Sequence, residues 1–364
     1  MRAAHITASR REEWNAFLAR QPSFALLQSW EWGEFKEKLG WKVFRVVVER
    51  QSQIVAGAQV LIKVLPLGPI GVAYIPRGPV GDWLDEEVAL QLLPELHRLA
   101  IYHKATFLKI EPPVLNDPAI HRVLRQHHFR ASAYTNQPHA TIILDLTQNL
   151  DDILEQMRKK TRQYVRLAAR IGVTVREGNG TEFSAFYDLM QATGRRGGFS
   201  LRSRDYYKYE WQTIAANDQS VLLMAFYQNR LVAMRMAYCF GEHAAEFHAG
   251  SSDEHRDLRP SYLLVWEAIK WAKAQGCATY DLWGIPDQVG QAVYAGNDPP
   301  VSNRTDGLWG VYRFKSGFSK NIVYYMGAYD YVYSPCLYKL IANKFLNVDT
   351  LDQIAVWMDS LRHS

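Results

Sequence analysis

Apolar and polar positions alternate along this chain in two hairpin-like stretches that resemble each other. Residues 46–62 read VVVERQSQIVAGAQVLI and residues 224–239 read MAFYQNRLVAMRMAYC. In each stretch a β-rich run is followed by a short polar turn and a second β-rich run, which is the pattern of a β-hairpin. Such hairpins are common in sheet proteins, so this pair indicates a repeat only if the neighbouring elements also match.

The elements around the two hairpins do match, and they come in the same order. An amphipathic helix is predicted before each hairpin, and a longer helix followed by a strand is predicted after it. The matching segments are EEWNAF (12–17) with TEFSAF (181–186), 88–103 with 261–276, and 107–113 with 278–284. We therefore predict two copies of one unit, an α/β (α+β) fold with the mixed sheet and element order of an acetyltransferase-like (GNAT-type) domain.

The boundary between the two copies is predicted near residues 147–150, where TQN follows a strand-like run and precedes a long helix. The first domain is expected to span residues 1–148 and the second residues 149–319. The segment 320–364 contains the strand-like run VYYMGAYDYVY, and we expect it to complete the first domain.

The composition is that of a soluble globular protein. Of 364 residues, 48% are hydrophobic and 22% are charged, and the net charge is only +5. Cys239, Cys277 and Cys336 are widely spaced and odd in number, so they predict neither a disulfide framework nor a CxxC metal site. The first residues lack the apolar stretch of a signal peptide, and no run approaches the roughly 18 apolar residues of a membrane span. We expect a cytoplasmic protein with no transmembrane segment.

Several catalytic motifs are absent from the sequence, which contains no GxxxxGK[ST] loop, no HExxH and no GxSxG. Acetyltransferases hold the pyrophosphate of coenzyme A on a short Gly-rich loop before a helix. The equivalent segment of the second copy, 250–264, reads GSSDEHRDLRPSYLL and has no glycine after its first residue, so coenzyme A is disfavoured. The adjacent His127 and His128 fit a solvated helix end better than a metal site, and no metal is expected.

A row of arginines is predicted on the helix from about 150 to 171. They recur every four residues, and so lie on one helix face, at Arg158, Arg162, Arg166 and Arg170. No acidic residue interrupts this basic stretch. Two interpretations stay open, a solvated charged face or a surface that contacts the phosphates of a nucleic acid such as tRNA.

Four further segments carry a family resemblance. They are FALLQSWEWGEFKEKLGW (24–41), MRKKTRQYVRLAARIGV (157–173), AGSSDEHRDLRPSYLLVWEAIKWAKAQGCATYDLWGI (249–285) and GLWGVYRFKSGFSKNIVYYMGAYDYV (307–332). Taken in this order, they resemble the FemABX family of tRNA-dependent aminoacyl transferases, which build peptidoglycan cross-bridges. The resemblance covers nearly the whole chain, and the family's duplicated acetyltransferase-like domains agree with the internal repeat.

The resemblance implies the substrates. The donor would be an aminoacyl-tRNA, and the acceptor a muropeptide linked either to UDP or to a lipid. Larger members of the family insert two long helices as a coiled-coil arm in the second domain. No heptad stretch occurs there in this sequence, so the chain is similar to the short form, which favours the UDP-linked acceptor. No cofactor is implied, and we expect a monomer.

The resemblance also implies roles for residues that bind the acceptor. Lys36 matches a lysine that pairs with the acceptor's diphosphate, although a lysine on such a helix would otherwise be expected in solvent. Arg202 and Tyr206 match an arginine and a tyrosine that hold the same diphosphate and its sugar, with Arg204 a close competitor in this register. His248 stands where the family can have a tyrosine, and it is either a substitute for that tyrosine or a buried, hydrogen-bonded core histidine.

Two residues are expected at the chemical step. Lys315, in FKSGF, matches the lysine closest to the chemistry in the family; otherwise it is a turn lysine before a glycine. Glu111, in KIEPP, stands where the family often has an acidic residue and is a candidate general base. In the implied aminolysis the acceptor amine attacks the ester of the charged tRNA, and its proton goes to Glu111 or to the leaving oxygen. Lys315 would stabilise the anionic intermediate or hold the terminal phosphate.

Two functions of other classes stay compatible with this sequence. One is an acyl-coenzyme A-dependent N-acyltransferase on the same fold, against which the missing Gly-rich loop argues. The other is a non-catalytic RNA-binding protein that retains the fold without the activity, which only a turnover measurement separates from an enzyme.

Overall fold

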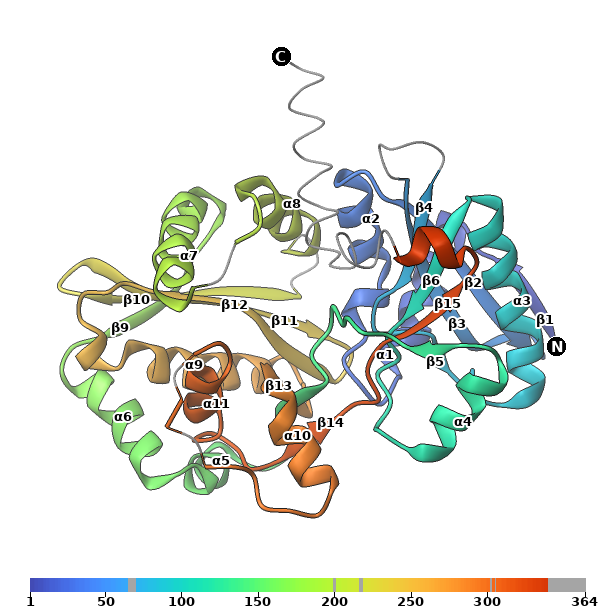
Figure 1. Cartoon of the computed structure of the whole chain (residues 1–364). Coiled ribbons are helices and arrows are strands. Elements are labelled where there is room, and N and C mark those ends of the chain that lie inside the picture. The colour runs from blue at the N-terminus through green and yellow to red at the C-terminus, as the bar shows by residue number, and fades with distance from the viewer. Residues whose placement is uncertain (65–69, 199–200, 216–218, 302, 305, 340–364) are drawn as a thin grey trace. The chain divides into compact units, whose positions relative to one another are not determined.

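The computed structural model describes residues 1–64, 70–198, 201–215, 219–301, 303–304 and 306–339 (Figure 1). The chain divides into two compact units. The first unit consists of Met1–His139 with Tyr325–Ser364, and the second of Ala140–Tyr324. Each unit has its own sheet and its own apolar core.

The first unit is built on a mixed sheet. Its strands, in spatial order, are β1 (Arg2–His5), β2 (Lys42–Arg50), β3 (Gln53–Val64), β4 (Gly71–Ile75), β6 (Ala105–Ile110), β15 (Tyr329–Val332) and β7 (Arg130–Ala131), with β5 (Val80–Gly81) paired to β3. All neighbouring strands are antiparallel except β4 and β6. Two parallel strands need a long crossover connection, and here the crossover is α3 (Glu86–Tyr102).

The helices of the first unit begin where side chains cap them and pack where apolar residues recur. The carboxylate of Asp85 accepts hydrogen bonds from the backbone N–H groups of Glu87 and Val88 and so starts α3. The apolar face of α3 packs on the sheet and forms one core with it. Further helices among the described residues of this unit are α1 (Arg11–Ala19), α2 (Trp30–Lys38) and α4 (Pro118–Gln126), and residues 335–339 are also helical.

One glycine of this unit allows a close approach between a helix and the sheet. A Cβ atom on Gly57 of β3 would lie 2.8 Å from the Trp14 ring of α1 and 2.8 Å from the carbonyl oxygen of Val46. No larger residue fits there without displacing the ring or the neighbouring strand.

The second unit has a second mixed sheet. Its strands, in spatial order, are β9 (Thr174–Glu177), β10 (Ser220–Tyr227), β11 (Arg230–Phe240), β12 (His243–Ser251), β13 (Thr279–Ile285), β8 (Ala140–Asp145) and β14 (Ile322–Tyr324). Among the described strands of this sheet only β12 and β13 run parallel, and α9 (Pro260–Ala274) forms their crossover. Its other helices are α5 (Leu150–Gln156), α6 (Lys159–Arg170), α7 (Phe183–Gly197), α8 (Arg204–Ile214), α10 (Asp287–Tyr294) and α11 (Trp309–Lys315).

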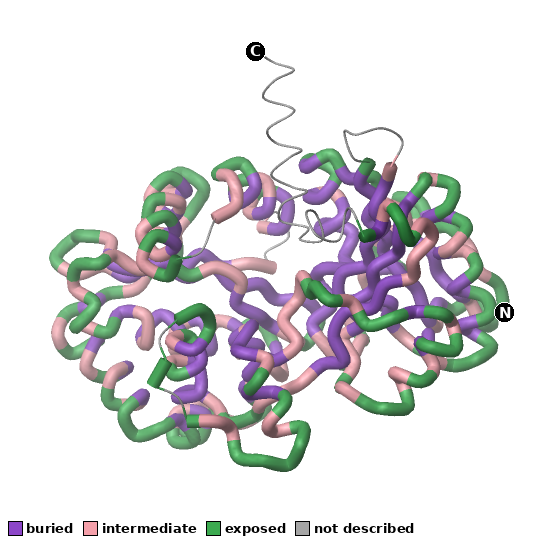
Figure 2. Tube along the Cα trace, in the orientation of Figure 1, coloured by how far each residue is buried: buried purple, intermediate pink, exposed green. Residues whose placement is uncertain are grey.

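The two sheets repeat one topology, which confirms the predicted duplication of an acetyltransferase-like unit. In both, three antiparallel strand pairings lead to a parallel pair that is joined by a helix, and further antiparallel strands follow. The helix pair α1 and α2 precedes the hairpin of the first unit, as α7 and α8 precede that of the second. Strand residues are mostly buried, whereas exposed residues lie mainly on helices and loops (Figure 2).

The structure differs from the predicted boundaries in two places. The strand predicted at 141–146 is β8, which pairs with β13 and belongs to the second unit rather than the first. The return to the first unit begins at Tyr325, and its strand β15 pairs with β6 and β7. Residues 340–364 of the predicted completing segment lie outside the described residues.

The single long helix predicted from about 150 to 171 is wrong, because the chain breaks there into α5 and α6. Met157 and Arg158 are extended between the two helices, with ψ angles of 152° and 140°. The backbone N–H of Arg158 donates to the carbonyl of Gly317 at 2.9 Å instead of continuing a helix. In the part of the chain that the structure describes, no helix is both long and apolar enough to cross a membrane.

Candidate functional site

Lys315 ends α11 with its side chain buried inside the second unit. Its ammonium group donates a hydrogen bond to the carbonyl oxygen of Gly284 at 3.1 Å. A carboxylate oxygen of Glu246 lies 3.7 Å away. Taking an ammonium group out of water is costly unless it is paired and hydrogen-bonded, so these two partners account for its burial. The alternative of a turn lysine before Gly317 agrees with the backbone, since Lys315 ends α11 there, but it does not account for the burial of the side chain.

A buried network of charges surrounds Lys315. The guanidinium of Arg235, on β11, forms an ion pair with Glu246, and both side chains are buried. Asp281, on β13, accepts hydrogen bonds from the Thr141 hydroxyl and from the backbone N–H of Trp283. Burial lowers the pKa of Lys315, and the negative charge of Glu246 opposes that effect.

An irregularity in β13 aims the Gly284 carbonyl at Lys315. The pairing of β13 with β8 shifts register between Asp281 and Gly284. Within that shift Trp283 adopts a left-handed backbone conformation, with φ of +63°. A bulky residue rarely holds this conformation, and bulges and such outliers cluster at functional sites. The bulge therefore marks this end of β13 as a candidate site.

A second cluster of the same unit lies on α8. The guanidinium of Arg202 covers the ring of Tyr206, with 4.2 Å between the guanidinium carbon and the ring centre. Arg204, the competitor in this register, is the first residue of α8 and is exposed. One helical turn beyond Tyr206, the carboxylate of Glu210 is buried and contacts Nε2 of His248 at 2.9 Å.

His248 is held by its partners. Glu210 also accepts a hydrogen bond from the Tyr238 hydroxyl at 3.2 Å, and the Tyr207 ring lies 4.9 Å from the imidazole. Burial together with the charge of Glu210 raises the pKa of Tyr238, so this hydroxyl keeps its proton and donates. The arrangement fits the hydrogen-bonded histidine of the two predicted alternatives, and it fixes the imidazole between Glu210 and the Tyr207 ring.

Lys36, in the first unit, is buried rather than exposed on α2. Its ammonium group lies 5.1 Å from the centre of the Phe35 ring and 5.6 Å from that of Trp32. Nearby, the guanidinium of Arg45 stacks on Trp30 at 3.5 Å, and burial lowers the pKa of Arg45 to about 10. Solvent exposure, the alternative to a binding role for Lys36, is therefore wrong.

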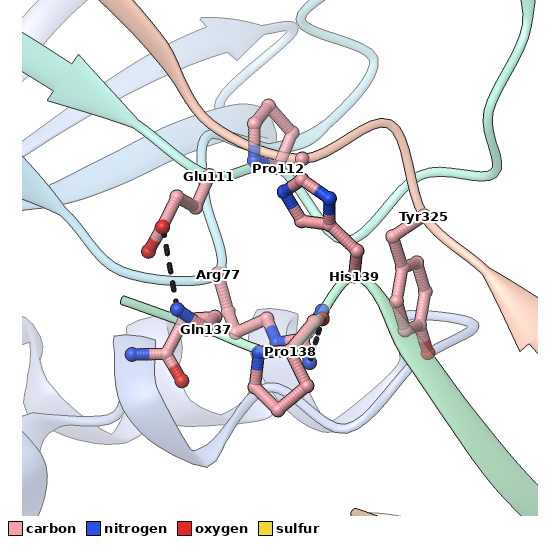
Figure 3. Close-up of a pocket in the computed structure, with 8 residues that line it drawn as sticks. Arg77, Glu111, Pro112, Gln137, Pro138, His139 and Tyr325 are labelled. Atoms are coloured by element: carbon pink, nitrogen blue, oxygen red, sulfur yellow. Dashed lines mark hydrogen bonds between the residues drawn. The ribbon is translucent and has the colours of Figure 1, made fainter. Parts of the chain in front are cut away.

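Glu111 lines a small pocket in the first unit, whose other lining residues are Arg77, Pro112, Gln137, Pro138, His139, Tyr325 and Gly327 (Figure 3). Its carboxylate accepts hydrogen bonds from the backbone N–H groups of Asn136, at 2.6 Å, and Gln137, at 3.3 Å, and from the hydroxyl of Tyr74. Burial and the charge of Glu111 raise the pKa of Tyr74, so the phenol remains a donor. Three donors thus hold this carboxylate in place.

Arg77 supplies the cation of this pocket. It has a left-handed backbone, with φ of +47°, and donates to the carbonyl of Pro138 at 3.2 Å. Its guanidinium carbon lies 4.5 Å from the ring centre of Tyr325. In Figure 3 the Arg77 side chain runs along Pro138 while Glu111 points at the backbone of Gln137. The pocket therefore offers one buried cation and one buried anion.

The predicted arginine row is only partly available to a ligand. Arg166 and Arg170 are exposed on α6, and Arg158 is exposed just before it. Arg162 instead donates to the carbonyls of Glu155 and Met157, both at 2.6 Å, and so fastens α6 to the end of α5. The N-terminus of α6 lies against the turn that follows Lys315, where a Cβ atom on Gly317 would be 2.3 Å from the hydroxyl of Thr161.

The structure divides the predicted site residues between the units. Lys36 and Glu111 belong to the first, and Lys315, Arg202, Tyr206, His248 and the arginine row to the second. Sequence reasoning missed Arg235, Glu246 and Asp281. A signal for two of them was present, because Arg235 and Glu246 are charged residues inside otherwise apolar strands, RLVAMRMAYC and HAAEFHAG. Among the described residues, no group of three or more His, Cys, Asp or Glu side chains is arranged to hold a metal ion.

Comparisons with known proteins agree with this architecture. A family model described as the FemAB family matches residues 9–120, 118–227 and 222–344. A lipid II:glycine glycyltransferase of Staphylococcus aureus (strain MRSA252) is 25% identical, over 94% of this chain and 95% of the relative. The crystal structure of FemX superposes with a TM-score of 0.81 at 23% identity, over 94% of this chain and all of the other. A tandem GNAT protein from clavulanic acid biosynthesis superposes with a TM-score of 0.52 at 11% identity, over 91% of this chain and 98% of the other.

Proposed function

Because the chain belongs to the FemAB family, we propose that it transfers an amino acid to the peptide of a peptidoglycan precursor, as a step in building the interpeptide bridge. The similarity to glycyltransferases over nearly their whole length supports this activity. We propose aminoacyl-tRNA as the donor and the side-chain amine of the precursor peptide as the acceptor. The observation that carries the proposal is Lys315, a cation buried beside a backbone carbonyl and a carboxylate.

The chemical step is the aminolysis of an ester. The amine nitrogen bonds to the ester carbonyl carbon, the bond from that carbon to the ribose oxygen of the tRNA breaks, and an amide forms. The ester is already activated, so bringing the two substrates together is itself worth about 7 to 11 kcal/mol. Negative charge develops on the carbonyl oxygen, and Lys315 stabilises it as a fixed cation in a site from which water is excluded.

The proton of the attacking amine goes to the leaving ribose oxygen, rather than to Glu111. Three hydrogen-bond donors already hold the Glu111 carboxylate, so its oxygens are engaged within the first unit. In this proposal Glu111 orients the segment of Asn136 and Gln137 and, through Tyr74, shapes the wall of its pocket. It is therefore a positioning residue, not a base.

The acceptor that we propose is the lipid-linked precursor. The name of the similar glycyltransferases contains lipid II, a lipid-linked molecule, and this outweighs the preference for a UDP-linked acceptor that follows from the short form of the chain. Both precursors contain a diphosphate. We propose that Lys36 binds this group, and that Arg202, Tyr206 and His248 bind it and the adjoining sugar.

The donor is proposed to dock through basic residues on and near α6. Arg158, Arg166 and Arg170 are exposed there, and the N-terminus of α6 adjoins the Lys315 turn through Gly317. Phosphates bound along α6 would thus lead to the Lys315 site. Arg162 contributes indirectly, by holding α6 against α5.

The test is a transfer assay with purified protein and charged tRNA, in which the acceptor is either the UDP-linked precursor or the lipid-linked precursor in detergent micelles. Mass spectrometry of the product identifies the amino acid and the acceptor. The variant to compare with the unmodified protein is Lys315→Met, which removes the charge. We expect its single-turnover rate to fall about 100- to 1,000-fold with folding intact. A fall below tenfold would remove Lys315 from the chemical step.

The same assay separates the two rival functions. Acylation from acyl-coenzyme A without tRNA would support the N-acyltransferase, and tight tRNA binding without any product would support a binding protein. The structure argues against coenzyme A, because the segment between β12 and α9 turns through two non-glycine residues in left-handed conformations, His255 and Arg259. A Gly-rich pyrophosphate loop is absent from that described segment.

A further inference from the structure

Two of the three cysteines, which lie far apart in the sequence, meet in the core of the second unit. Cys239 is near the end of β11, and Cys277 follows α9 just before β13. Both are buried, and their sulfur atoms are 2.8 Å apart. The third cysteine, Cys336, is in the first unit and is exposed.

The backbone holds both cysteines in place. The N–H of Cys239 donates to the carbonyl of Gln219 at 2.8 Å, and the N–H of Cys277 donates to that of Ala272 at 3.0 Å. A disulfide bond is about 2.05 Å long, so its closure needs each sulfur atom to move by less than about half an ångström. The gap that closure must cover is therefore small.

The two thiols are not equivalent. The hydrogen bond between them lowers the pKa of Cys239, against the opposing effect of burial, whereas the same hydrogen bond and burial raise the pKa of Cys277. The thiolate is the nucleophilic form of cysteine. Cys239 is accordingly the sulfur that reacts first, with Cys277 in position to react next.

We propose that Cys239 and Cys277 form an oxidation site, which a hydroperoxide converts to an intramolecular disulfide. The sulfur of Cys239 attacks the peroxide, the O–O bond breaks, and a sulfenic acid and one molecule of water form. The sulfur of Cys277 then displaces the oxygen from Cys239, which leaves as a second molecule of water. Two thiols are oxidised by two electrons and one hydrogen peroxide is reduced, so the reaction balances. A thiol reductant reverses it.

The bond would join β11 to the segment just before β13, next to two strands that support the Lys315 network. Arg235 is on β11, and Asp281 and Gly284 are on β13. Closure needs only a small movement of the two sulfur atoms, so we expect the network to persist in the oxidised protein. The main effect of the disulfide is resistance to unfolding, because the cross-link restricts the unfolded chain.

The test uses the full-length protein, treated with a small excess of hydrogen peroxide and then with an alkylating reagent under denaturing conditions. We expect peptide mass spectrometry to find Cys239 linked to Cys277 and Cys336 alkylated. We also expect the midpoint of thermal unfolding to rise by about 5 °C or more and to return after reduction. Cys336→Ser should retain both results, whereas Cys239→Ser and Cys277→Ser should lose both.

Several outcomes would overturn the proposal. The proposal is wrong if both thiols can still be alkylated after the treatment. It is also wrong if either cysteine is found as sulfinic acid, or if oxidation is confined to dimers linked through Cys336. Peptide mapping of the unmodified chain decides the question even if a serine variant fails to fold. Because no substrate enters this test, its result is independent of the proposed transferase function.

Discussion

The charge of Lys315 depends on Glu246, the carboxylate nearest to it in the buried network. Burial lowers the pKa of Lys315 and Glu246 limits that lowering. As the pH rises through this pKa, the ammonium group loses its proton, and the cation that stabilises the developing oxyanion is lost. The unfolded chain holds the same proton more tightly, so this lysine contributes a stability that increases with pH between its folded and its unfolded pKa.

Glu246→Gln removes the negative charge and should lower the pKa of Lys315 further. We expect the alkaline fall of the transfer rate to move to lower pH by about 1 to 3 pH units. The pH profile of single-turnover rates is the measurement, and Glu246→Asp should restore the original profile in part. A profile that keeps its position while the overall rate drops would assign Glu246 a purely structural role.

Arg202 and Arg204 offer a matched pair for testing acceptor binding. Arg202 covers Tyr206, while Arg204 starts α8 and is exposed. Arg202→Ala should weaken binding of the diphosphate-containing acceptor by about 1.5 to 3 kcal/mol, the worth of a charge-assisted hydrogen bond, while Arg204→Ala should not. Calorimetry with the lipid-linked precursor in detergent micelles measures both. Equal effects of the two variants would contradict the assignment.

Lys36 needs a different substitution because it is buried among aromatic rings. Alanine would leave a cavity, whereas methionine keeps the volume and removes only the charge. In the same calorimetric experiment, Lys36→Met should weaken acceptor binding with little change in tRNA affinity. Normal acceptor binding by this variant would remove Lys36 from the diphosphate site.

At the level of elements, α6 carries the prediction about tRNA. Changing both Arg166 and Arg170 to glutamine should weaken tRNA binding and flatten the dependence of log affinity on log salt by up to about 2 units. The reason is that tRNA binding releases fewer counterions when two phosphate contacts are missing. The control is Arg122→Gln with Arg125→Gln on α4, a pair of exposed arginines in the first unit. An unchanged slope in the α6 variant would mean that tRNA docks elsewhere.

The elements also show how far the sequence could predict this protein. The hairpins and crossover helices were predictable, because burial of one sheet face imposes a local apolar pattern at 46–62 and at 224–239. The break at Met157 was not, since lysine, arginine and glutamine favour helices and the interruption comes from a long-range hydrogen bond to Gly317. For the same reason the contact between Lys315 and Glu246, which joins α11 to β12, was beyond any local pattern.

In the molecule as a whole, the sheet of the first unit is completed by β15, which follows the second unit in the sequence. Lys109 of β6 and Asp330 of β15 form a fully buried ion pair at 2.9 Å, and Asp330 also accepts a hydrogen bond from the Tyr338 hydroxyl. Asp330→Asn leaves the Lys109 charge uncompensated and should lower the free energy of unfolding by about 3 to 5 kcal/mol. Urea unfolding measures the loss.

Two further variants make that measurement decisive. Lys109→Met combined with Asp330→Leu removes both charges and should recover much of the stability that the single variant loses. Asp306→Asn, which breaks an exposed ion pair with Arg304, should leave the unfolding curve unchanged. If the double variant is no more stable than Asp330→Asn, the loss does not come from the stranded charge.

The first unit is formed by two segments that lie on either side of the second unit in the sequence, and this determines when the first unit can be completed during synthesis. Residues 1–139 leave the ribosome before β15 is translated, so their sheet stays incomplete while all of Ala140–Tyr324 is translated. The second unit is continuous and can fold as soon as it has emerged. Until β15 arrives, β6 presents an open edge, the kind of edge that pairs with other chains. We therefore expect the nascent first unit to be open to aggregation through β6 from the emergence of residue 139 until β15 is complete.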